Sequence, residues 1–208
     1  MGRSARIIIL EASGSIRTGE ASATGVYAME ERSPLDRRAF HAELERVRAD
    51  FHRLRAEASP TDLRRPTDGT RWTNEQLLFH MLFGYMLVRV LLTLLGVFAR
   101  LPGVVGRTFA RLLDAAARPF HIINYLSSAA GSLYYNHHRM GAKMNRTLAA
   151  LQQRLDREST DSLSRGMHYP PRWDPYFQDW MTRADLYRYP TQHYDFHRAQ
   201  LTLGPTHT

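Results

Sequence analysis

The sequence predicts an all-α fold, most simply an up-and-down four-helix bundle with additional short helices. In several segments apolar residues recur every three or four positions, which is the period of an amphipathic helix. No segment alternates convincingly between apolar and polar residues with the period of two that a strand requires. With 208 residues, of which 43% are apolar, the chain is long enough to bury one sizeable core.

The first 33 residues differ in composition from the remainder of the chain. They are rich in Gly, Ser, Ala and Thr, and their one apolar run, at 7–10, is too short for the core of a signal peptide. We therefore expect a weakly ordered N-terminal extension over 1–33, one helical domain over 34–203 and a short tail over 204–208.

The formal net charge is +8, and nearly all of the positive charge is arginine, since Lys143 is the one lysine. The arginines are scattered in runs of at most two, so the sequence does not favour nucleic-acid binding. Cysteine is absent, which excludes disulfides, thiolate metal sites and a cysteine nucleophile. We expect a cytoplasmic protein that does not bind nucleic acid.

The first helix is expected to begin at Ser33 and Pro34, because serine is a good N-cap and proline suits the first helical position. Apolar residues then follow at alternating intervals of four and three, which gives the narrow stripe of a bundle helix: Phe40, Leu44, Val47, Phe51, Leu54 and Ala58. A linker with two prolines and a glycine follows over 59–70.

The second helix has the strongest start signal in the chain. Thr73 and Gln76 have the spacing of a capping box, and Trp72 and Leu77 have that of a hydrophobic staple. We expect this helix to run to about Arg100.

The second helix is also long and apolar enough to span a bilayer. However, His80 and Arg89 lie about 180° apart on its surface, so a spanning helix would have ionisable groups on opposite sides. A bundle helix instead buries one of them and exposes the other. The bundle interpretation is therefore favoured, and a buried dimer face is a further explanation for the surplus apolar surface.

The remaining elements are predicted from periodicity and from breaker residues. We expect a short helix over 104–117, interrupted by Pro119, and then another long helix within 122–157. A loop over 158–175 and a short helix over 176–187 precede the last helix. That helix should begin at Pro190 or Thr191 and end before residue 204.

Two histidines in the last predicted helix suggest half of a metal site. His193 and His197 are four residues apart, so their rings project from one helix face. If Thr191 caps the helix, His193 lies in its first turn, where the helix dipole favours the neutral imidazole that a metal needs. A third ligand must come from another helix. His80 is the best candidate, because it lies on the inward face. Gly84, one turn further on, removes a side chain beside it and could open a cavity.

Each of these histidines also has a purely structural interpretation. His80 could be a core histidine bonded to a carbonyl group, and His193 and His197 could be half-exposed. His121 could approach the same cavity, whereas His137 and His138 are adjacent, so their side chains diverge on a helix. In the stretch 124–138, Asn124, Tyr134 and Tyr135 could line a pocket or serve helix packing.

Two segments resemble the DinB/YfiT-like proteins, a family of bacterial four-helix bundles, and the resemblance covers about residues 35–203. The stretch GTRWTNEQLLFHMLFGY (69–85) looks like the family's second helix, with its tryptophan and histidine. The stretch HYDFHRAQL (193–201) looks like its C-terminal HxxxH motif. The resemblance implies an inward-facing metal ion held by His80, His193 and His197. The loop and aromatic-rich insert over 158–188 departs from the family pattern.

For several members, the family implies transfer of a low-molecular-weight thiol to a small electrophile, and mycothiol is that thiol in high-GC actinobacteria. Three neutral imidazoles leave the ion at its full charge, which acidifies a bound thiol or water. We therefore expect a zinc- or nickel-dependent thiol S-transferase or a related hydrolase, with the metal-bound thiol or water as nucleophile. Two alternatives stay open: a non-catalytic protein of the same fold that acts by association, for example as a homodimer, and a membrane-associated helical protein.

Overall fold

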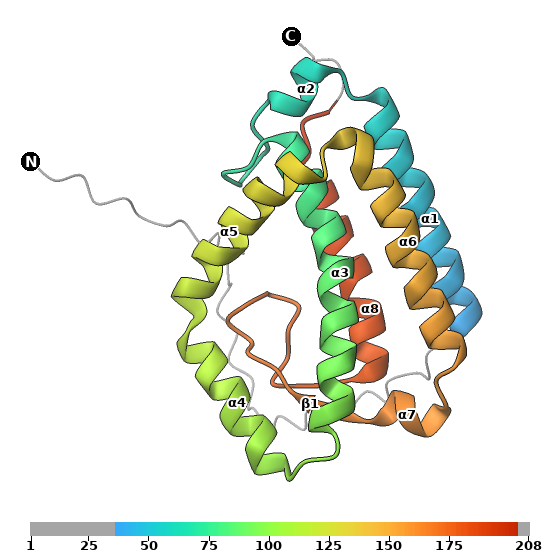
Figure 1. The fold of residues 1–208 in the computed structure, drawn as a ribbon, viewed down its shortest axis with the longest axis vertical. Coiled ribbons are helices and arrows are strands. Elements are labelled where there is room, and N and C mark those ends of the chain that lie inside the picture. Colours follow the sequence, from blue (N-terminus) through green and yellow to red (C-terminus); the bar gives the residue numbers. More distant parts are fainter. Residues whose placement is uncertain (1–35, 204–208) are drawn as a thin grey trace, which may run out of the picture. The chain divides into compact units, whose positions relative to one another are not determined.

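The computed structural model describes residues 36–203, and this part of the chain is predominantly helical, as predicted (Figure 1). It contains eight helices and one antiparallel pair of short strands. The elements are α1 (Arg37–Glu57), α2 (Pro60–Arg64), α3 (Asn74–Phe98), α4 (Gly103–Ala115), α5 (Ala117–Tyr134), α6 (His137–Asp156), α7 (Thr160–Ser164), β1 (Gly166–His168), β2 (Trp180–Thr182) and α8 (Arg183–Arg198). The predicted extension (1–33) and tail (204–208) lie outside the described residues.

Helices α1, α3, α6 and α8 supply most of the buried core residues. Helix α3 packs against α6 and α8, and α1 packs against the same two helices (Figure 1). The predicted apolar stripe of the first helix is buried from Phe40 to Leu54, and Ala58 is partly buried against the same core. On α6 a matching face is fully buried: Met140, Met144, Leu148, Leu151 and Leu155.

The start of α1 differs from the prediction. The helix begins at Arg37, and Asp36 is its N-cap, because its carboxylate accepts hydrogen bonds from the backbone N–H groups of Arg38 and Ala39. The predicted cap, Ser33, and Pro34 lie outside the described residues. An aspartate cap is as favourable as the serine cap that the sequence suggested.

The start of α3 is confirmed. The Thr73 hydroxyl accepts from the Gln76 N–H, and the Gln76 side chain accepts from the Thr73 N–H, which completes the capping box. By length and composition α3 could cross a membrane, and 44% of its most apolar stretch is buried inside the domain. His80 is buried and Arg89 is exposed, as expected for a bundle helix.

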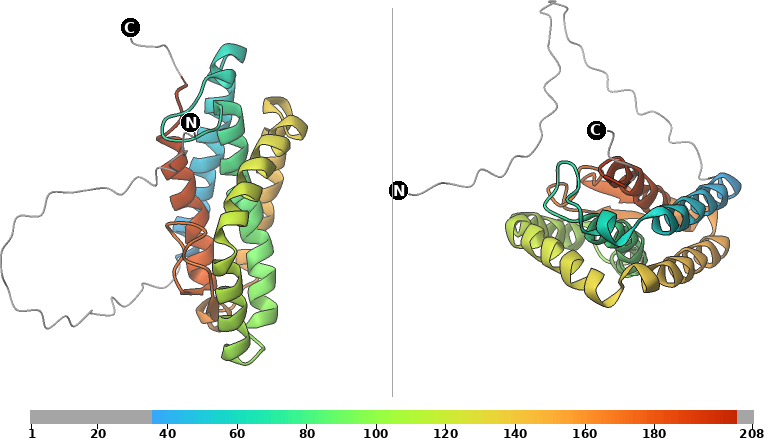
Figure 2. Two further views of the ribbon diagram at one scale, coloured as in Figure 1. Left: turned by 90° about the vertical axis from the view of Figure 1, so that its left-hand side faces the viewer. Right: turned by 90° about the horizontal axis from the view of Figure 1, so that it is seen from above.

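Helices α4 and α5 follow one another along α3 (Figures 1 and 2). They are separated at Ala116, and Pro119 lies in the first turn of α5, where its missing N–H is tolerated. Helix α6 is the long helix predicted within 122–157. The same range also holds most of α5, which ends before α6 because Tyr135 and Asn136 leave the helical conformation.

The segment between α6 and α8 was predicted as a loop over 158–175 and a short helix over 176–187, and this prediction is only partly right. It contains the short helix α7 and the strands β1 and β2, whose register pairs Met167 with Met181. An aromatic-rich loop, residues 169–179, connects the two strands; we call it the insert loop. Its Trp173 stacks on Phe120 of α5 with 3.7 Å between ring centroids.

The predicted start of the last helix, at Pro190 or Thr191, is wrong. Helix α8 begins at Arg183, because Thr182 and Asp185 form a capping box there. Pro190 lies inside the helix, where it removes one backbone hydrogen bond without ending the helix. The sequence signal of proline as a first helical residue was therefore misleading here.

Candidate metal centre

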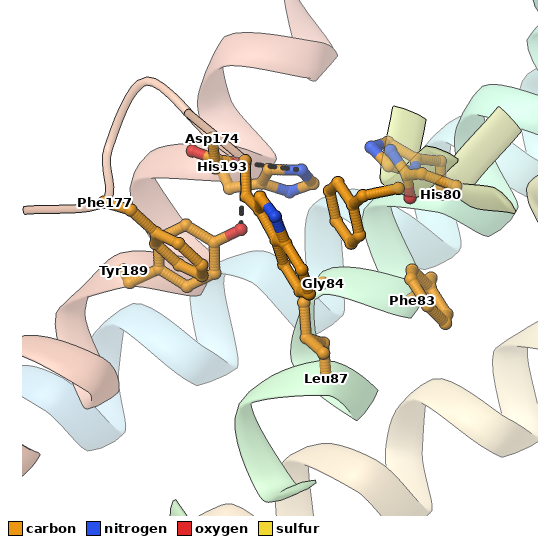
Figure 3. Close-up of a pocket in the computed structure, with 11 residues that line it drawn as sticks. His80, Phe83, Gly84, Leu87, Asp174, Phe177, Tyr189 and His193 are labelled. Carbon is orange, nitrogen blue, oxygen red and sulfur yellow. Dashed lines mark hydrogen bonds and ion pairs between the residues drawn. The ribbon is translucent and has the colours of Figure 1, made fainter. Parts of the chain in front are cut away.

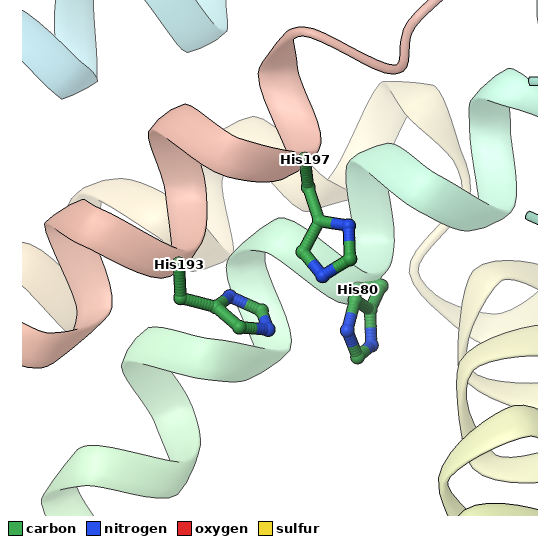
Figure 4. Close-up of side chains that lie close together, drawn as sticks. All are labelled: His80, His193 and His197. Atoms are coloured by element: carbon green, nitrogen blue, oxygen red, sulfur yellow. The ribbon is translucent and has the colours of Figure 1, made fainter. Parts of the chain in front are cut away.

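Three buried histidines meet between α3 and α8. Their candidate ligand nitrogens all lie within 4.8 Å of one another. The ring centroids of His80 and His193 are 4.9 Å apart, those of His80 and His197 are 4.7 Å apart, and those of His193 and His197 are 4.5 Å apart. Figure 4 shows the three rings turned toward one another. The structure therefore brings together the three residues that the sequence singled out.

The three imidazoles are held neutral by burial and not by a helix end. His193 lies in the third turn of α8, so the proposed effect of the helix dipole does not apply. Burial lowers the pKa values of His193 and His197 to about 4 and places that of His80 well below its usual range. At neutral pH all three rings are in the neutral form, in which one ring nitrogen carries a proton and the other has a lone pair to offer.

Hydrogen bonds fix two of the rings. His80 Nδ1 lies 3.0 Å from the Ser128 hydroxyl of α5, and His197 Nδ1 lies 2.7 Å from Gln200 Oε1. The amide oxygen can only accept, so Nδ1 of His197 carries the proton and Nε2 carries the lone pair. Such outer partners set the tautomer and orientation of ligating histidines.

Trp72 covers one side of the group. Its indole stacks on His80, with centroids 4.3 Å apart, and meets the ring of His197 edge-on at 6.2 Å. Trp72 immediately precedes the cap of α3, so the same local sequence that begins the helix also places an aromatic wall beside His80. This packing keeps the two imidazoles in a dry environment.

Gly84 makes room for His193. A Cβ atom at position 84 would lie 2.8 Å from His193 Nδ1, closer than side chains normally approach. Gly84 is one turn beyond His80 on the same face of α3, so its missing side chain leaves space for the ring from α8. The sequence-based suggestion of open space beside His80 is thus borne out by the geometry at this position.

A carboxylate from the insert loop, which the sequence did not single out, approaches His193. Asp174 Oδ2 lies 3.7 Å from His193 Nε2, and the same oxygen accepts a hydrogen bond of 2.9 Å from the Tyr189 hydroxyl (Figure 3). Burial raises the pKa of Asp174 and places that of Tyr189 well above its usual range. The one sequence signal for this approach was the neighbouring Trp173 in RWDPYF (172–177), a large side chain in a loop that needs a packing partner. In the structure it donates to the Leu113 carbonyl of α4 and stacks on Phe120 of α5.

A small pocket adjoins His80 and His193. Its walls are mostly apolar, with Asn124 and Asp174 as the main polar groups beside the histidines and Tyr189 (Figure 3). The apolar walls come from α3, α5 and the insert loop: Phe83, Leu87, Phe120, Trp173 and Phe177. A ligand in this pocket would contact the histidine group on one side and aromatic rings on the other.

Other residues considered from the sequence do not join the group. His121 is exposed on α5, and His137 lies 3.4 Å from Glu75 instead. Asn124 does line the pocket, whereas Tyr134 is exposed and Tyr135 stacks on Phe79.

The residues fit a bound divalent transition metal. Three neutral imidazoles are ligands that zinc, copper, iron and nickel accept. Neither ring nitrogen of His193 forms a hydrogen bond within residues 36–203, and its Nδ1 is buried. No hydrogen bond therefore occupies the Nε2 lone pair of His193, which leaves this nitrogen free to bind an ion.

No family model matches the sequence, and no curated protein and no solved structure matches it either.

Proposed function

We propose that this protein binds one divalent transition metal, zinc or nickel, through His80, His193 and His197. The observation that carries the proposal is the meeting of three buried, neutral imidazoles from two helices that are distant in the sequence. A lone buried histidine is common in protein cores. Three histidines whose ligand nitrogens lie within 4.8 Å of one another match the ligand set of a three-histidine site.

We also propose that the domain is a four-helix bundle of the DinB type, formed by α1, α3, α6 and α8. The mutual packing of these helices supports this proposal, as does the position of the three histidines on the second and the last of them. Helices α4 and α5 and the insert loop are then additions to that core arrangement.

The proposed activity is transfer of a low-molecular-weight thiol, such as mycothiol, to a small electrophile, or a related hydrolysis. A divalent ion supplies acidification of a bound thiol or water. The chain's own residues keep the imidazoles neutral, exclude water through Trp72 and the aromatic pocket walls, and leave space for a small molecule next to His193. Because the chain contains no cysteine, the sulfur must arrive on the co-substrate.

The first test is metal content. The purified protein should carry close to one equivalent of metal, and His193→Ala should reduce this strongly. His121→Ala is the matched control, because His121 is an exposed histidine outside the group and its loss should change nothing. Absence of metal from the wild-type protein, together with failure to bind added zinc or nickel, would refute the proposal.

The second test is activity. The metal-loaded protein should accelerate conjugation of a thiol with a model electrophile, and both metal removal and His193→Ala should abolish the acceleration. Metal binding without any conjugation or hydrolysis would leave a metal-binding protein and refute the proposed transferase.

Association with a second copy of the chain is the other candidate function, favoured by an exposed apolar face on α5. Five of its large side chains lie within about 120° of the helix surface and are each more than half exposed: Ile122, Ile123, Leu126, Leu133 and Tyr134. Apolar patches of this kind mark interaction surfaces. A two-fold dimer requires one self-complementary patch, so α5 against α5 of another copy is the simplest occupant.

Light scattering of the purified protein tests the association. The wild-type protein should be a dimer, and Leu133→Arg should convert it into a monomer with unchanged helix content. Arg118→Ala on the same helix serves as a control outside the apolar face. A monomeric wild-type protein that binds lipid vesicles would favour the membrane alternative and refute the dimer.

A further inference from the structure

Asp174 is a largely buried carboxylate in the insert loop. Its side chain is 14% exposed. Its Oδ1 accepts a hydrogen bond of 2.9 Å from the Tyr176 N–H, and its Oδ2 accepts one of 2.9 Å from the Tyr189 hydroxyl. These two donors fix the carboxylate with Oδ2 directed to His193 (Figure 3).

The negative charge of this carboxylate has no cation to balance it within residues 36–203. Its one ion-pair contact there is His193 Nε2 at 3.7 Å, which is too long for a hydrogen bond. A buried charge is normally paired with an opposite charge or coordinates a metal. A positive charge is therefore expected beside Asp174 Oδ2, and none of the described side chains supplies it.

A metal ion among the histidines would supply that charge. Ligand nitrogens and carboxylate oxygens lie about 2.0–2.2 Å from a bound zinc ion, so two ligands of one ion are separated by about 3–4 Å. The 3.7 Å between Asp174 Oδ2 and His193 Nε2 falls within this range. Asp174 lies outside the group of three histidines whose ligand nitrogens are within 4.8 Å of one another, so its carboxylate must move closer to His80 and His197 when the ion binds. We infer that Asp174, through Oδ2, is a fourth protein ligand of the ion, an inference that rests on the proposed three-histidine site.

The inference assigns two further roles. Tyr189 becomes the outer partner that orients the carboxylate, as hydrogen-bonded groups commonly do for ligating carboxylates. The insert loop, which lies outside the sequence segments that suggested the site, becomes part of it. Three imidazoles and one carboxylate fill a tetrahedral ion, whereas an octahedral ion keeps positions for a thiol or substrate. The donor set therefore favours nickel, or another ion with more than four ligands, for a reactive site.

The test is titration of the metal-free protein with Co²⁺, whose visible absorption reports the coordination number. Asp174→Asn keeps the shape of the side chain and removes its charge, and Asp174→Ala also removes the oxygen. Both should weaken Co²⁺ affinity by at least about tenfold and change the absorption spectrum. Asp179→Asn is the matched control in the same loop, because its side chain is 74% exposed and should leave affinity and spectrum unchanged.

Thermal unfolding gives a second readout that does not depend on activity. Without metal, Asp174→Asn should be at least as stable as the wild-type protein, because a buried unbalanced charge is gone. With saturating Co²⁺, the rise in melting temperature should be smaller in the variant than in the wild type.

The outcomes separate this inference from the proposed function. If both Asp174 variants bind Co²⁺ with wild-type affinity and spectrum while His193→Ala does not bind it, Asp174 is not a ligand and the three-histidine site stands. If the wild-type protein binds no Co²⁺, zinc or nickel, the site itself is refuted, and the role of Asp174 with it.

Discussion

Gly84 of α3 and His193 of α8 are in such close contact that a single methyl group at position 84 would lie 2.8 Å from the imidazole Nδ1. The glycine is therefore part of the histidine site although it contributes no ligand. Gly84 contributes by leaving the space that the imidazole of His193 occupies.

We predict that Gly84→Ala displaces His193. The variant should lose about 1–3 kcal/mol of unfolding free energy through overpacking, and its metal affinity should fall. Chemical denaturation and metal titration measure the two effects. Gly96→Ala is the matched control on the same helix, because its new Cβ would have Arg183 Nη2 at 3.8 Å as nearest neighbour. That control should be neutral or more stable by up to about 1 kcal/mol, since alanine is the better helix former.

The buried histidines should make the metal-free protein less stable in mild acid. Below pH 6.5 the unfolded chain protonates these histidines, whereas in the folded state His193 and His197 stay neutral down to about pH 4. The unfolded state therefore binds more protons, and the free energy of unfolding falls as the pH decreases through this window. The expected slope is about 1.4 kcal/mol per pH unit for each histidine.

Denaturant midpoints at several values between about pH 7 and pH 5 measure this slope. The double variant His193→Gln, His197→Gln should have a markedly shallower slope than the wild type, whereas His121→Gln should not differ from it. An identical slope in the double variant and the wild type would show that the two imidazoles are protonated in the folded state.

The ion pair between Glu158 and Arg183 should be a major stabilising contact at the start of α8. The two side chains are 9% and 11% exposed, and the carboxylate lies 2.5 Å from Arg183 Nη1. Glu158→Ala leaves the guanidinium buried without this partner and should cost about 3 kcal/mol of unfolding free energy. In the exposed pair Asp161–Arg165, by contrast, Asp161→Ala should cost at most about 0.5 kcal/mol. Equal losses in the two variants would contradict the prediction.

The position of the α8 start can be tested through its cap. Thr182→Ala removes the hydroxyl that accepts from the Asp185 N–H and should cost about 1 kcal/mol, whereas Thr182→Ser keeps a hydroxyl and should cost less. Amide hydrogen exchange should accelerate over the first turn, residues 183–186, in the alanine variant. Unchanged exchange there would mean that the helix starts later, as the proline suggested.

The sequence predicted the elements whose signals are local. The Thr73 capping box and the apolar stripe of α1 depend on residues a few positions apart, and both are present in the structure. His80, His193 and His197 were recognisable because their spacing and their helix faces are also local properties. Their meeting depended on the packing of α3 against α8, which the resemblance to a known family suggested.

The errors arose where distant contacts decide the structure. The sequence signal of Pro190 predicts a helix start, yet α8 already begins at Arg183 after the capping box at Thr182. The buried side chains of Tyr187 and Tyr189 stabilise the turn that precedes the proline. Asp174 has no spacing relationship to the histidines in the sequence. It reaches them because Trp173 stacks on Phe120 and donates to the Leu113 carbonyl, contacts that no periodicity predicts.

The division of the three histidines between α3 and α8 has a consequence for how the chain holds together. An ion bound by both helices would act as a removable crosslink between an early and the final helix of the domain. Its binding would raise the free energy of unfolding, by an amount that grows with the free metal concentration. Without the ion, α8 would be held to the rest of the domain by its own side-chain contacts, among them the fully buried Leu186, Tyr187 and Tyr194.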